Sequence, residues 1–246
     1  MRTPGKIVLA LAVAALAAGA ACAQTVSQRE EIAVFSLGSY RWNIPPSALG
    51  AIDEELRAVF INLGRFDVIG MAYRLEAEDV RGFIDAITAN RERTFEIPES
   101  VALGREHLTQ TDVTRLVSGF VVVIPSVVDF IRETRKDSWN VEIRTSFTFV
   151  DVAEGRSFAQ FFLTTSGSDP NIDRAVRKAV DAIPARLTFE VRRIDRFTLR
   201  TGILEVHGRE VVIELGSRMG VKAGDEYLVL SPRVLSSAGK SSRRRA

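Results

Sequence analysis

Histidine and cysteine, which most often supply catalytic bases, nucleophiles and metal ligands, are scarce in this sequence. Its 246 residues include two histidines, His107 and His207, and one cysteine, Cys22. A catalytic triad or a three-histidine metal site would require the two histidines to meet across distant segments. We therefore expect each histidine to be structural or solvent-exposed, and the sequence predicts no metal site.

Motifs of catalysis and of nucleotide binding are absent as well. The sequence has no G-x-S-x-G, no H-E-x-x-H and no phosphate-binding loop. Its acidic pairs, such as Glu54 and Glu55, fall on predicted helix faces, where carboxylates are usually solvated. These absences predict a protein that is not an enzyme and that holds no cofactor.

Long apolar runs are absent except at the start of the chain. Residues 7–21 are small and apolar, follow Arg2 and Lys6, and lead into Ala23. A charged start, an apolar middle and a small-x-small site are typical of a bacterial secretory signal peptide, which we assign to residues 1–23. No later segment approaches the roughly 18 consecutive apolar residues of a membrane-spanning helix. The protein is therefore expected in the periplasm or in association with the outer membrane.

Two processing routes compete at Cys22. Simple cleavage fits the small residues Ala21 and Ala23 and leaves a chain without cysteine, and therefore without disulfides. Lipidation of Cys22 would instead tether the protein to a membrane through acyl chains. Gly19 stands where lipoprotein signals usually carry a Leu-like residue, which favours simple cleavage. Membrane contact thus depends on the route taken.

A large excess of one charge is absent from the body of the chain. The formal net charge is +2, and six of the positive charges lie in the signal peptide and near the C-terminus. The residues between them therefore carry a net charge of −4. Together with the secreted address, this disfavours nucleic acid as a partner. Residues 233–246, rich in serine and basic residues, are predicted to be a disordered tail.

Residues 30–195 are predicted to form one α+β domain that opens with a βαβ unit. The apolar run from Ile32 to Phe35 is typical of a buried strand. Pro45 and Pro46 open an amphipathic helix that ends at Gly64. A second strand, residues 65–69, follows. The two strands are therefore expected to be parallel and joined by a right-handed crossover.

Helical segments are predicted to follow this unit. Apolar spacing indicates an amphipathic helix over residues 77–91. Short helical pieces are expected between residues 98 and 116, with Thr111 or Asp112 as a cap.

An antiparallel meander is predicted next. Its strands are expected at residues 120–131, 139–151 and 157–165, and the middle one alternates between apolar and polar side chains. The domain closes with a helix over residues 171–183, which Pro184 is expected to end or kink.

A small β module is predicted over residues 196–232. Residues 203–206 and 211–215 alternate like strands around a turn at Gly208, and residues 227–230 form a last strand. Repeated glycines permit the turns of a small barrel. The fold class is therefore α+β: a βαβ unit and an antiparallel meander packed with helices, followed by a small barrel-like module.

Residues 31–187 resemble the envelope domain shared by the CsgG-like curli-secretion channel family and the N-terminal domain of the Tol-Pal translocation protein TolB family. The resemblance is carried by residues 32–35, by residues 63–69, and by the strand ending at Val152 with Gly155 behind it. Residues 202–230 are similar to the C-terminal module of flagellar assembly protein T. The resemblance implies a role in envelope assembly without attached chemistry.

Two groups of residues are candidate contact sites. Phe147 and Phe149 would face lipid if several subunits formed a joint β-barrel, as extra hairpins do in the curli-channel family. Packing of these rings on the helices is the alternative that the tight flanking turns favour. Arg174, Arg177 and Lys178 lie on the outer face of the helix over residues 171–183. They would contact a neighbouring subunit or an anionic surface, or remain solvated.

The predicted function is that of a non-enzymatic adaptor or ring component that assembles or stabilises an envelope machine. The flagellar basal body is the first guess, and the expected partners are envelope proteins and identical copies in a homo-oligomer. The alternatives are a subunit of a curli-type outer-membrane secretion channel, a periplasmic activator of cell-wall synthesis, and a periplasmic hydrolase that depends on His107.

Overall fold

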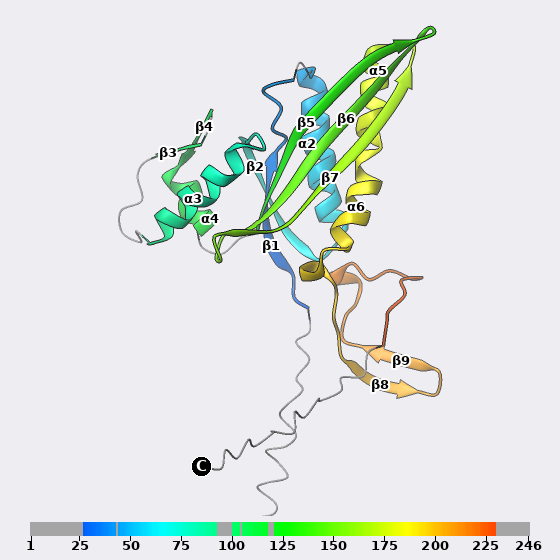
Figure 1. The fold of residues 1–246 in the computed structure, drawn as a ribbon. Coiled ribbons are helices and arrows are strands. Elements are labelled where there is room, and N and C mark those ends of the chain that lie inside the picture. Colours follow the sequence, from blue (N-terminus) through cyan, green and yellow to red (C-terminus); the bar gives the residue numbers. More distant parts are fainter. Residues whose placement is uncertain (1–26, 43, 93–99, 104, 118–120, 230–246) are drawn as a thin grey trace, which may run out of the picture.

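The computed structural model describes residues 27–42, 44–92, 100–103, 105–117 and 121–229. The predicted signal peptide, Cys22 and the predicted basic tail lie outside the described residues. The described chain forms a mixed sheet with helices packed on it, followed by a small hairpin (Figure 1).

The central sheet has a parallel part and an antiparallel part. The first strand pairs in parallel with a neighbour on each side, and a long meander extends the sheet in the order β2-β1-β5-β6-β7. Its strands are β1 (Glu30–Ser36), β2 (Phe66–Arg74), β5 (Val121–Arg135), β6 (Ser138–Asp151) and β7 (Arg156–Asp169). The predicted parallel strand pair, the meander and the α+β fold class are confirmed.

Helices pack on both faces of this sheet (Figure 1). One face carries α2 (Pro46–Asn62), α5 (Ile172–Asp181) and α6 (Ile183–Arg192), and the other carries α3 (Asp79–Glu92) and α4 (Gln110–Val117). Two hydrophobic clusters result, one between the sheet and each helical layer.

β1 lies between the two clusters, which explains its continuous apolar run. Ile32 and Val34 belong to the cluster under α2, and Ala33 and Phe35 to the cluster under α3. All four side chains are at most 2% exposed. A strand covered on both faces needs no polar alternation, so the apolar run predicted this strand correctly.

α2 begins and ends where the sequence predicts. Pro46 occupies its first turn, where the missing N–H has no intrahelical partner anyway. Ile52 and Phe60 are completely buried against the sheet. Gly64 follows the helix with a φ of +73°, a left-handed conformation that glycine adopts without strain.

The region between α3 and β5 differs from the prediction. Instead of helical pieces only, it contains a hairpin, β3 (Ser100–Leu103) and β4 (Glu106–Thr109), before α4. The two strands bury Leu103 and Leu108, but each is only four residues long, too short to show a period of two. The cap of α4 is also different, because Thr109 Oγ1 accepts the Asp112 N–H at 3.2 Å.

The last predicted helix of the domain is two helices. Asn171 caps α5 by accepting the Arg174 N–H at 3.1 Å, and α5 ends at Asp181. α6 then starts at Ile183 with Pro184 in its first turn. The predicted end of the helix next to Pro184 is confirmed, with the break at Ala182, whereas α6 itself was not predicted.

The C-terminal part is simpler than the predicted barrel. Within the described residues it contains one hairpin, β8 (Ile203–His207) and β9 (Glu210–Ile213), and a short 3-10 turn, η3 (Ser217–Met219). Residues 227–229 have no regular secondary structure. The hairpin prediction is confirmed, and the predicted third strand is wrong over the residues that are described.

Two contacts join the hairpin segment, residues 198–219, to the main domain. Phe197, in the 3-10 turn η2 (Asp195–Phe197), is buried against Phe66 and Phe149, so main-domain packing continues past the predicted boundary at 196. Gly220 lies against the end of α2, where an added Cβ would meet the Leu63 carbonyl oxygen at 1.9 Å. The segment is therefore held at both of its ends.

Candidate interaction site

The structure places the predicted aromatic contact residues in the core. Phe147 and Phe149 are both 0% exposed. Phe149 packs against other phenylalanines, and its ring centroid lies 5.7 Å from the ring centroids of both Phe161 and Phe197. The alternation of β6 therefore turns these rings toward the helices. The prediction of a lipid or partner contact at Phe147 and Phe149 is wrong, and the packing alternative is confirmed.

Two of the three predicted basic contact residues are held in an ion-pair cluster. Arg174 Nε lies 3.0 Å from Asp169 Oδ1, and Lys178 Nζ lies 2.9 Å from Asp169 Oδ2. The backbone N–H of Asn171 also donates to Asp169, and together with Lys178 it lowers the pKa of that carboxyl. The cluster ties α5 to the end of β7. One carboxylate is thus shared by two exposed cations and offsets only half of their charge, and a partner contact at Arg174 and Lys178 stays a prediction.

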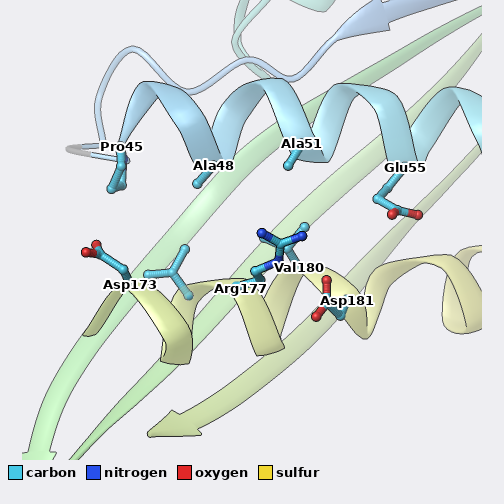
Figure 2. A pocket seen from close by; sticks show the side chains of 9 residues that line it. Pro45, Ala48, Ala51, Glu55, Asp173, Arg177, Val180 and Asp181 are labelled. Carbon is cyan, nitrogen blue, oxygen red and sulfur yellow. The ribbon is translucent and has the colours of Figure 1, made fainter. Parts of the chain in front are cut away.

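The third residue, Arg177, lines a groove between α2 and α5. Figure 2 shows its guanidinium reaching from α5 toward α2. The groove has a volume of about 270 Å³ and a lining of small side chains such as Ala48 and Ala51. The carboxylates that line the groove are Glu55, Asp173 and Asp181. Arg177 is thus surrounded by acidic groups and does not extend a basic patch.

The two histidines are far apart and exposed. His107 lies on β4 and His207 on β8, at separate ends of the molecule in Figure 1. His207 Nε2 lies 2.7 Å from Glu205 Oε2 on the same strand. Among the described residues, no cluster of three or more potential metal ligands occurs, and no helix has both the length and the apolarity needed to span a membrane.

A polar cluster holds the loop between β1 and α2. The buried Asp53 accepts the Leu37 N–H at 2.8 Å and pairs with Arg74. The Tyr40 hydroxyl donates to Glu106, and burial together with this carboxylate raises the pKa of Tyr40 to about 12. A phenol with so high a pKa stays neutral at physiological pH. Because these side chains already bond one another and the backbone of the loop, a structural role is the better interpretation.

Arg196 forms a second polar junction, between η2 and the sheet. Its Nε lies 2.7 Å from Glu30 Oε1, and its Nη1 donates to Asp151. Burial raises the pKa of Asp151, but the bonds from Arg196 and from the Glu154 N–H outweigh it, so this pKa is below its usual value. The junction links the two ends of the main domain.

The Arg196 junction predicts a pH-dependent stability. Replacing Arg196 with glutamine is expected to cost about 1–2 kcal/mol at pH 7. Because the folded pKa of Asp151 is lowered, its contribution is present above the ordinary value of 3.8 and is lost as pH falls through the lower folded pKa. The stability difference between wild type and Arg196→Gln, measured by urea unfolding, should therefore shrink below pH 3.8. A difference independent of pH would contradict the assigned ion pair.

The β8–β9 hairpin presents an apolar face to solvent. Val206 pairs with Val211 across the hairpin, and these side chains are 63% and 51% exposed. Leu204 beside them is 59% exposed. The neighbouring positions on the strands, Glu205 and His207, are polar. An isolated two-stranded hairpin is marginally stable in water, so this exposed face is a candidate contact surface.

A second exposed apolar site lies between β7 and α6. It is a hollow of about 340 Å³ whose lining includes Phe162 and Phe189, which are 52% and 60% exposed. Neither ring was predicted as a contact residue from the sequence. The pair Phe161-Phe162 in a strand was the available signal, because two adjacent strand residues point to opposite faces. Phe189 lies among polar helix neighbours, which carried a weaker signal.

Comparison with known proteins yields similarities to solved structures alone. No family model matches the chain, and no curated protein matches it significantly. The lipoprotein GNA1162 from Neisseria meningitidis is 9% identical over 66% of this chain and 97% of its own, with a TM-score of 0.36. The PelC dodecamer from Paraburkholderia phytofirmans is 14% identical over 68% of this chain and 87% of its own, with a TM-score of 0.38.

A minor lipoprotein from Acinetobacter baumannii is also similar. It is 8% identical over 70% of this chain and 96% of its own, with a TM-score of 0.33. Similarities of this strength carry no argument about function. The function of this chain therefore has to rest on its own residues.

Proposed function

We propose that this protein is a non-enzymatic assembly protein of the bacterial envelope that acts through protein contacts, including contacts between identical copies. The observation that carries the proposal is the solvent-exposed apolar face of the β8–β9 hairpin, with Val206 at its centre. Contiguous exposed apolar surface on a soluble domain marks an interaction site. The secretory signal predicted over residues 1–23 supports the envelope as its place of action.

The finer proposal is an adaptor or ring component of an envelope machine, with the flagellar basal body as the first machine to test. The hairpin is joined to the main domain through packing contacts at two residues, Phe197 and Gly220. This arrangement suits a protein whose sheet domain provides a rigid body while the hairpin makes the contact. The groove between α2 and α5, where Glu55 and Arg177 lie among small apolar side chains, is an additional and more selective surface in this proposal.

The proposal is tested by comparing the native complexes of wild type and Val206→Glu in the cells that make the protein. A charge placed in a buried apolar contact costs several kcal/mol, so the variant should be lost from chemically cross-linked complexes. Ile61→Glu is the matched control, because Ile61 is 58% exposed on α2 and belongs neither to the β8–β9 hairpin nor to the lining of the hollow between β7 and α6. Identical cross-linked complexes in wild type and Val206→Glu would contradict the proposal.

A further inference from the structure

Two surfaces lack a partner among the residues that the structure describes, and they complement each other. One is the β8–β9 hairpin and the other is the outer edge of β7. β7 is the last strand of the sheet, so no described strand pairs with that edge. An unpaired strand edge is a template for pairing with another chain.

The part of the β7 edge from Thr164 to Ser168 is protected. Arg186 donates to the Thr164 carbonyl, and Lys178 Nζ donates to the Ser168 carbonyl at 3.0 Å. Charged side chains laid over an edge in this way block pairing. Because alternate residues of a strand turn their backbone groups to the same side, Phe162 is expected to share the outward orientation of Thr164. The part of the edge at and before Phe162 is the part that remains available, and the Arg186–Thr164 bond lies at its border, in the lining of the hollow between β7 and α6.

The available part of the edge is apolar and basic. Phe162 and Phe189 line the hollow between β7 and α6. The Arg144 guanidinium lies 4.8 Å from the Phe162 ring centroid, and the Arg193 guanidinium lies 5.3 Å from that of Phe189. Glu190 is the one carboxylate among the described residues that line the hollow, and it lies 3.7 Å from Arg193, so Arg144 and Arg186 supply the remaining positive charge. The site therefore combines two exposed rings with a cationic rim.

The hairpin has the opposite charge. Its exposed carboxylates are Glu205 and Glu210, against one arginine, Arg209, so the hairpin carries a formal net charge of −1 with His207 neutral. Its apolar face is rich in valine and leucine, the side chains that pack well against aromatic rings on a sheet surface. The hairpin and the edge are thus both made of strands, both carry exposed apolar side chains, and have opposite charges.

We propose that the β8–β9 hairpin of one copy docks on the β7 edge and the Phe162–Phe189 hollow of a second copy. The inference rests on the proposed function, since it names the surfaces through which the copies associate. Hairpin and edge are different surfaces, so the contact is head-to-tail. Repetition of a head-to-tail contact produces a ring when the rotation closes and a filament when it does not.

The test uses two single variants of the purified protein, Phe162→Glu at the edge and Val206→Glu at the hairpin. Both positions are more than half exposed, so the fold should be retained, which circular dichroism checks. Each variant alone lacks one half of the contact and should sediment as a monomer, with self-affinity weakened about 100-fold or more. Ile61→Glu should keep the wild-type mass.

Mixing the two variants provides the decisive measurement. The mixture contains one intact hairpin and one intact edge, so it should form a 1:1 heterodimer that grows no further. Two variants that stay monomeric when mixed would overturn the head-to-tail contact, and variants that each keep the wild-type mass would overturn the assignment of these surfaces. A wild type that is itself monomeric would instead overturn the self-association on which the inference rests.

Discussion

Replacing Phe149 with alanine is expected to destabilise the protein by about 3–5 kcal/mol, the usual cost of removing a fully buried phenylalanine. Phe149 is 0% exposed and contacts Phe60, Phe158 and Phe197, so one truncation empties the centre of the main core. Urea unfolding followed by tryptophan fluorescence measures the loss directly, since Trp42 packs at the border of the same cluster.

Phe162→Ala is the matched control for this change. Phe162 is the same residue type on the adjacent strand, but its ring is 52% exposed, so its truncation should cost less than about 1 kcal/mol. Equal losses in the two variants would be inconsistent with the described packing of β6. A large loss at Phe149 alone separates a core ring from a lipid-facing ring, because a lipid-facing ring adds little to the stability of a soluble domain.

Replacing Gly220 with alanine is expected to detach the hairpin segment from the main domain. Gly220 has a φ of +77°, and its Cβ would meet the Leu63 carbonyl oxygen at 1.9 Å, so the substitution adds both backbone strain and a clash. A loss of at least about 1.4 kcal/mol would raise the detached population tenfold. Trypsin cleavage at the exposed Arg200 should then accelerate about tenfold or more, because cleavage follows the open population.

Gly224→Ala is the control that isolates the contact from the strain. Gly224 also has a left-handed φ, +91°, but an added Cβ there would meet nothing within 4 Å. Backbone strain should destabilise this variant locally by about 1–2 kcal/mol, while the hairpin segment stays attached. Equal cleavage rates at Arg200 in the two glycine variants would argue against a packing role for Gly220.

Local patterning was sufficient to predict most of the main domain. The apolar run from Ile32 to Phe35, the helix opened by Pro46 and the alternation along β6 each follow from burial of one or two faces, which a short segment displays by itself. The hairpin at Leu103 and Leu108 was missed because four-residue strands carry no measurable period.

The candidate site was harder to predict because exposure depends on what covers a residue. Phe147 and Phe149 follow the pattern of an amphipathic strand, and the pattern alone does not say whether helices or lipid cover them. Arg174 and Lys178 look like free cations in sequence, but the fold brings Asp169 between them. Phe162 becomes a candidate only once β7 is known to be the edge strand.

The central claim is that the protein works by associating with copies of itself, and its native mass tests this claim most directly. The protein should be extracted from envelopes in mild detergent and measured by light scattering. A stable assembly several times the mass of one 27.1 kDa chain is the expected result. A monomer at micromolar concentration, released without detergent, would contradict the account.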